Sequence, residues 1–153
     1  MRMRQSNRTR SRLMRAGATA VETAAVLTVF LLFLFGILEY CRLIYCQQVI
    51  TNAAREGARY AIVNSFNSTI VSDTQAVVQG YMGGLDKSLE NYNCQVYAAD
   101  ASSNNIGSPQ NVAFGDYICC DVSVTYSPIL PSFLYMSNNL TLRSKCCMGC
   151  EAN

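Results

Sequence analysis

A predominantly apolar stretch of 21 residues, Ala18 to Leu38, constrains this chain more than any other feature. As an α-helix it would be about 31 Å long at ~1.5 Å per residue, which matches the hydrocarbon core of a bilayer. A secretory signal has a shorter apolar region, about 7–15 residues, followed by an A-x-A-like cleavage site. This stretch is too long for a signal peptide and lacks such a cleavage site, so we predict a transmembrane helix that contacts membrane lipid.

The residues before the stretch carry concentrated positive charge. The first fifteen positions contain no acidic residue and six arginines: Arg2, Arg4, Arg8, Arg10, Arg12 and Arg15. Such an arm can bind nucleic acid through phosphates, but positive charge beside an apolar segment also retains that end in the cytoplasm. The direct fusion to the apolar segment favours the second role. We predict a single pass through the inner (cytoplasmic) membrane, with a cytoplasmic N-terminus, an extracytoplasmic C-terminal domain and no nucleic-acid partner.

Glu22 is the one carboxylate inside the apolar stretch. Its charge would cost about 2.5–3.5 kcal/mol at the centre of a bilayer and less near an end. Cleavage between Gly17 and Ala18 would create an α-amine one helical turn away. At ~4 Å such a pair gains on the order of 4 kcal/mol at an effective dielectric of 20. The simpler alternative is an acid favoured by the helix dipole near an N-terminus.

Two motifs in combination resemble the TadE-like pseudopilins of the tight-adherence (Flp-type) pilus system. One runs from Arg15 through Gly17 and Glu22 into the apolar stretch, and the other is TNAAREGARY, residues 51–60. The resemblance implies a substrate of a prepilin peptidase that cleaves after the glycine of a G-x-x-x-x-E motif, here Gly17 and Glu22. Major pilins of this type commonly have Tyr after the glutamate. Thr23 stands there instead, which favours a minor subunit that contacts other pilins or pseudopilins.

The rest of the chain predicts an α+β, pilin-like fold. The helix continues to about Tyr60, and a second, short helix is expected near residues 71–79. Strands are predicted at residues 92–98, 117–126 and 140–147, forming a roughly three-stranded antiparallel sheet, with a turn-forming loop at 104–110. The expected organisation is a basic leader, 1–17, a transmembrane and juxtamembrane helix, 18–62, and an extracytoplasmic domain, 63–153.

Small residues recur at spacings of three and four near the end of the long helix: Ala53, Ala54, Gly57, Ala58 and Ala61. This stripe permits close approach of another backbone. It would pack either on neighbouring subunits or on the chain's own sheet, and amphipathic helices usually face their own core.

Eight cysteines in a chain presented outside the cytoplasm suggest disulfides. Adjacent residues of a strand face opposite sides of the sheet, so Cys119 and Cys120 cannot share a partner on one face. Cys147 and Cys150 form a C-x-x-C that would alternatively be redox-active or contribute to a zinc site. The connectivity is left open among the domain cysteines, which are Cys94, Cys119, Cys120, Cys146, Cys147 and Cys150.

Histidine, the commonest general base and metal ligand, is absent from the sequence. We therefore expect no enzyme, no cofactor and no metal site. The leading hypothesis is a minor pseudopilin for assembly of the pilus or a related secretion apparatus. The alternatives are an unprocessed, signal-anchored adhesin or binding domain, and a thiol oxidoreductase built on Cys147 and Cys150.

Overall fold

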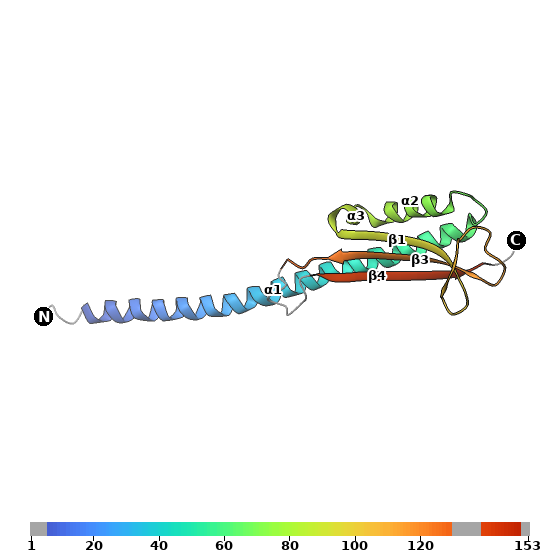
Figure 1. Cartoon of the computed structure of the whole chain (residues 1–153). Helices are drawn as coiled ribbons and strands as arrows, with labels where there is room; N and C mark the ends of the chain where they lie inside the picture. Colours follow the sequence, from blue (N-terminus) through green and yellow to red (C-terminus); the bar gives the residue numbers. More distant parts are fainter. Residues whose placement is uncertain (1–5, 130–138, 151–153) are drawn as a thin grey trace. The chain divides into compact units, whose positions relative to one another are not determined.

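The computed structural model describes residues 6–129 and 139–150, with side chains from Gly17 on, so the side chains of the predicted leader before Gly17 lie outside its described part. Figure 1 shows the element order. The helices are α1 (Ser6–Val63), α2 (Ile70–Met82) and α3 (Leu85–Ser88), and the strands are β1 (Glu90–Ala99), β2 (Asn105–Gly107), β3 (Tyr117–Tyr126) and β4 (Leu140–Gly149).

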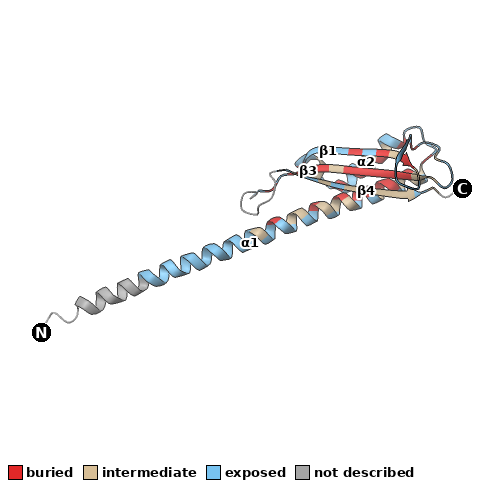
Figure 2. Ribbon diagram, turned by 60° about the horizontal axis from the view of Figure 1, so that its bottom comes forward, coloured by how far each residue is buried: buried red, intermediate tan, exposed pale blue. Residues whose placement is uncertain are grey.

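The chain forms two compact units, Met1–Tyr40 and Cys41–Asn153. In the first, α1 is a helix whose apolar side chains are exposed on all sides, as the pale blue ribbon in Figure 2 shows. By length and composition, the segment Gly17–Val63 is able to cross a membrane, and its most apolar window has a mean hydropathy of 2.4 with no residue buried. α1 ends at Val63, where the backbone N–H and the side-chain amide of Asn64 both donate to the carbonyl of Tyr60.

The second unit contains a four-stranded antiparallel sheet in the order β2-β1-β3-β4. The predicted α+β fold of a long helix, a short helix and a small antiparallel sheet is confirmed. The fourth strand, β2, lies inside the predicted loop 104–110. It has three residues, all exposed, and pairs only with Ala98 and Ala99 of β1. Such a strand shows no alternation of buried and exposed residues, the signal by which strands are recognised.

The core of the second unit lies between the sheet and the helices. The small-residue stripe of α1 is buried within it, since Ala53, Ala54, Ala58 and Ala61 have no exposed surface. A Cβ added at Gly57 would lie 2.5 Å from a Val78 methyl group and 2.9 Å from the Cys120 sulfur. The stripe therefore packs on its own domain, and its small side chains let α1 approach both α2 and β3.

α2 also contributes one buried side of a helix to this core. Its buried residues, Ile70, Thr74, Val78 and Met82, are spaced by four, so they share one face. The helix ends where Gly83 and Gly84 adopt positive φ angles of 58° and 88°, which other residues rarely adopt. The turn leads through α3 into β1, at the side of the sheet where α2 lies in Figure 1.

Candidate functional site

The predicted processing residues lie near the start of the described side chains, on α1. Gly17, Ala18 and Glu22 are all exposed, and a Cβ added at Gly17 would meet no atom within 4 Å. Among the side chains described, from Gly17 on, no cation pairs with Glu22. The helix places Ala18 and Glu22 four residues apart on one face, which is the spacing that an ion pair along a helix requires.

Nearby hydroxyl groups are satisfied within the helix. The hydroxyl of Thr23 donates to the carbonyl of Thr19, and that of Thr28 donates to the carbonyl of Ala24; each donor–acceptor distance is 2.8 Å. This back-bonding supplies a partner where no water is available, as in lipid. Glu22 is thus the polar side chain of this stretch that most needs a partner from outside its own backbone.

The apolar surface around these residues is large. Val26, Phe30, Phe33 and Ile37 expose between 58% and 69% of their surface. Contiguous apolar exposure on this scale marks an interaction with lipid or with another protein. This segment contributes no side chain to the core of the second unit.

The register of β3 and β4 arranges four cysteines in two adjacent pairs. Cys119 lies opposite Cys147, and Cys120 lies opposite Cys146. Cys119 and Cys147 form a disulfide that closes a separation of 28 residues, with Cα atoms 4.0 Å apart. The prediction that Cys119 and Cys120 face opposite sides of the sheet agrees with Cys120 alone belonging to the core beneath α1.

Three thiols gather on the helix-facing side of the sheet. Cys94 of β1 is 6% exposed and Cys120 is fully buried, while Cys146 is half-buried. A hydrogen bond from Cys120 lowers the pKa of the Cys94 thiol, and the same contact together with burial raises the pKa of Cys120. Burial raises the pKa of Cys146, which the guanidinium of Arg55 partly opposes. Cys94 is therefore the thiol of this group that ionises most readily.

The C-x-x-C motif does not act as a pair in this structure. Cys147 is bonded to Cys119, and Cys150 contacts the carbonyl of Val112 at 3.8 Å. Within residues 6–129 and 139–150, no group of three or more potential metal ligands is placed to hold an ion. The arrangement thus favours structural cysteines over a redox motif built on Cys147 and Cys150.

An ion pair on the other side of the sheet was not predicted. Asp121 of β3 is 6% exposed, and it accepts hydrogen bonds from Nε of Arg143 at 2.8 and 3.1 Å and from Nη2. The carboxylate of Asp121 raises the pKa of Arg143. An aspartate amid alternating apolar residues, with an arginine in the following strand, is the signal that was available in the sequence.

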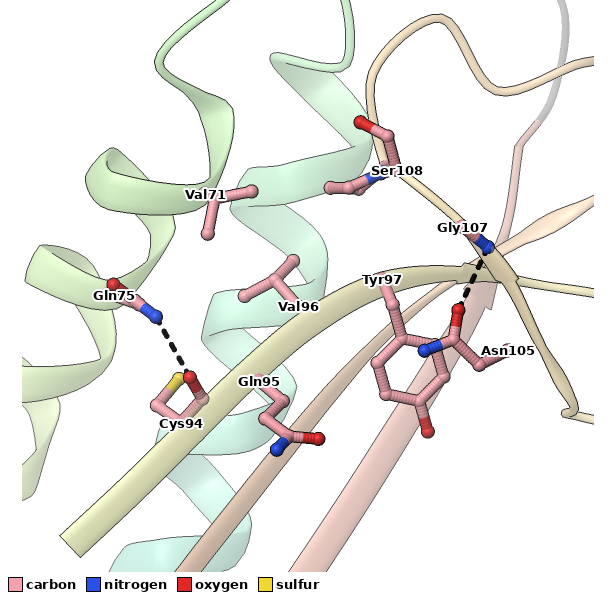
Figure 3. Close-up of a pocket in the computed structure, with 10 residues that line it drawn as sticks. Val71, Gln75, Cys94, Gln95, Val96, Tyr97, Asn105, Gly107 and Ser108 are labelled. Atoms are coloured by element: carbon pink, nitrogen blue, oxygen red, sulfur yellow. Dashed lines mark hydrogen bonds between the residues drawn. The ribbon is translucent and has the colours of Figure 1, made fainter.

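A groove of about 480 Å³ opens beside β1 (Figure 3). Val71 and Gln75 of α2 line one side and Asn105 of the β2 segment the other, and Cys94 and Val96 also line it. Nε2 of Gln75 donates a hydrogen bond to the carbonyl of Cys94, at a distance of 2.9 Å. That carbonyl consequently points away from β3 and toward the groove.

Comparison with known proteins locates one family match. Residues 17–59 match the family model described as TadE-like protein, so the match begins at the predicted cleavage glycine and extends into the buried stripe of α1. Searches among curated proteins and among solved structures each returned no match. The resemblance predicted from the Gly17–Glu22 motif and from residues 51–60 is confirmed: residues 17–59 of this chain are similar to the family of TadE-like proteins.

Proposed function

We propose that the chain is a minor pseudopilin, processed by a prepilin peptidase after Gly17 and assembled through its N-terminal helix into a tight-adherence pilus or a related secretion apparatus. The observation that carries this is the coincidence of three features in one segment. The TadE-like match starts at Gly17, Glu22 lies exposed among apolar residues, and the helix exposes its large apolar side chains from Val21 to Leu38.

Cleavage would change the electrostatics of this segment. The new α-amine of Ala18 titrates near pH ~8 when unperturbed, so it is mostly protonated at neutral pH. On α1 it would lie one turn from Glu22, and in an assembly the amine of a neighbouring copy displaced along the helix axis would serve equally well. Pairing offsets the cost of placing the carboxylate in lipid, and pairing between copies would fix the register of a filament.

The proposed membrane orientation follows from the arginines before the helix. It places Cys41 and everything after it outside the cytoplasm. Cys41 is exposed and outside the disulfide, so a membrane-impermeant thiol reagent applied to intact cells should label it. Labelling that requires disruption of the membrane would contradict this orientation, and a Cys41→Ala variant gives the background signal.

Mass determination of the protein from cell envelopes tests the processing. The proposed mature chain begins at Ala18. A mass that still includes the arginine-rich leader would instead support the alternative of an unprocessed, signal-anchored adhesin. A matched strain without the prepilin peptidase should accumulate the full-length chain.

Glu22→Ala tests the pairing separately from insertion. The variant should enter the membrane and be cleaved, because the apolar stretch and Gly17 are intact, yet it should fail to assemble. Glu56→Ala, which removes an acid on the far part of α1, is the charge-matched control. Normal assembly by the Glu22 variant would refute the role of this ion pair.

A further inference from the structure

The groove beside β1 gives one cysteine of the helix-facing side a route to solvent. Of Cys94 and Cys120, only Cys94 lines the groove and keeps measurable exposure, 6%, whereas Cys120 has none. Figure 3 shows the Cys94 side chain beneath Gln75 and next to Val96. A small reactant entering the groove therefore reaches Cys94 before it reaches Cys120.

The edge of β1 next to this groove is only partly covered. β2 pairs with β1 at Ala98 and Ala99 and nowhere else, and the ladder between β1 and β3 is irregular between Glu90 and Asn93. A strand with one unpaired edge and a break in its register is displaced more easily than the central strand β3. Cys94 follows this break in regular register opposite Val122, and its outer carbonyl is bonded by a side chain, Gln75, and not by a neighbouring strand.

Cys94 and Cys120 are staggered across the β1–β3 ladder. Cys94 lies opposite Val122, and Cys120 lies opposite Val96, which makes the two cysteines diagonal neighbours on one face. Diagonal Cα atoms are about 7–8 Å apart in a regular ladder, slightly beyond disulfide range, so bonding requires a small shift of β1 along β3. Both side chains belong to the core on the helix-facing side of the sheet, with Cys94 6% exposed and Cys120 fully buried.

We propose that Cys94 and Cys120 form a second disulfide, which joins β1 to β3 and is made when a disulfide-containing oxidant enters the groove. The Cys94 thiolate attacks one sulfur of the oxidant and releases the other as a thiolate. The Cys120 thiol then loses its proton and attacks Cys94 in this mixed disulfide, which releases the second half of the oxidant. Two electrons pass to the oxidant, which becomes two thiols, and one sulfur–sulfur bond forms in the protein.

Cys146 is the competing partner of Cys120, because the two are directly opposite in the β3–β4 ladder. Cys94 and Cys120 both belong to the buried core cluster, however, whereas Cys146 is only partly buried beside it, and burial raises the pKa of the Cys146 thiol. A bond from Cys94 would also link a strand that the disulfide of β3 and β4 leaves unlinked. Both linkages cannot form at once, so peptide mapping distinguishes them.

The test uses the full chain, solubilised in detergent, treated with oxidised glutathione, alkylated in denaturant and cut after aromatic residues. Cleavage after Tyr92, Tyr97, Tyr117 and Tyr126 isolates Cys94 on peptide 93–97 and both cysteines of β3 on peptide 118–126. In a Cys119→Ala, Cys147→Ala background, oxidation should join these two peptides through Cys94 and Cys120. In the unmodified chain, the same linkage appears as a three-peptide product that includes Cys147.

Single substitutions complete the test. In the same background, Cys120→Ala should abolish the linkage, whereas Cys146→Ala and Cys41→Ala should leave it intact. Recovery of Cys94 alkylated or carrying only glutathione, or of peptide 118–126 joined through Cys146, would overturn the assignment. If the double variant does not fold, the three-peptide product of the unmodified chain tests the same linkage. The linkage is independent of pilus assembly, so a negative result here leaves the pseudopilin role untouched.

Discussion

The two halves of α1 are both rich in apolar residues, but among the described side chains only those of the second half belong to the core of the sheet unit. Before Tyr40 the large side chains are exposed, with Phe33 at 69% and Ile37 at 63%. After Cys41, Ile50 and the alanines of the stripe are fully buried against the sheet unit. Side-chain size does not explain the contrast, because the large Ile50 is buried together with the small residues of the stripe; the second half has the sheet unit to pack against.

The largest expected difference in stability is between two isoleucine-to-alanine substitutions, one in each half of α1. Ile50→Ala should lower the free energy of unfolding of the sheet unit by about 2–5 kcal/mol, because it leaves a cavity in the core. Ile37→Ala should change it by less than about 0.5 kcal/mol, since Ile37 is largely exposed. Urea unfolding of both variants in detergent, followed by tyrosine fluorescence, measures the difference. Equal effects would mean that the two halves do not have separate packing roles.

Removal of the Cys119–Cys147 disulfide should have the next largest effect. The double substitution Cys119→Ala and Cys147→Ala opens a separation of 28 residues and should cost about 2–4 kcal/mol, mainly by freeing the unfolded chain. The helical circular dichroism of the first half should persist while the sheet unit unfolds at lower urea. Cys41→Ala, at an exposed cysteine, is the control and should leave the midpoint unchanged.

The close approach at Gly57 predicts a smaller loss. Gly57→Ala adds a methyl group 2.5 Å from Val78 and 2.9 Å from the Cys120 sulfur, and such overpacking costs about 1–3 kcal/mol. The gain in helix propensity, at most about 1 kcal/mol, does not compensate. Gly80→Ala is the matched control, because a Cβ there meets nothing within 4 Å, and it should stabilise α2. A stabilising Gly57→Ala would show that α1 and the sheet have room to separate.

The smallest effect concerns the loop after β1. Asp100 accepts hydrogen bonds from the backbone of Asn104 and Ser102, and chiefly the bond from Asn104 lowers its pKa. A lowered folded-state pKa means that the carboxylate stabilises the loop above about pH 4, the ordinary value for aspartate. This contribution is lost as the pH falls through the lower, folded value. The protection factors of the Ser102 and Asn104 amides, which compare their exchange with the intrinsic rate at the same pH, should therefore fall in acid, and Asp100→Asn should remove that dependence.

The sequence specifies the periodic parts of this molecule well. The apolar stretch predicts the helix, and the alternation of residues 117–126 predicts β3 with its observed bounds. β2 is not predicted, because its three exposed residues show no alternation of apolar and polar side chains. Its position depends on tertiary pairing with Ala98 and Ala99. The Gly17–Glu22 motif also predicts a processing site at the start of the apolar stretch.

The cysteine arrangement shows where such reasoning stops. Alternation separates Cys119 from Cys120, but the partner of each depends on the register of β3 with β4. That register follows from the packing of whole strands and cannot be read from local spacing. The same holds for Asp121 and Arg143, which meet only because their strands are neighbours.

The position of β4 at the edge of the sheet, as the last strand along the chain, has a consequence for biogenesis. β3 gains its second neighbour, and Cys119 its bonded partner, only after residues 140–149 have been translated. The helices precede that step along the chain, so α1 is complete while the sheet still has an open side. A ribosome stalled before residue 140 would leave a nascent chain with one edge of β3 unpaired, which makes the end of synthesis the interval when a chaperone is most needed.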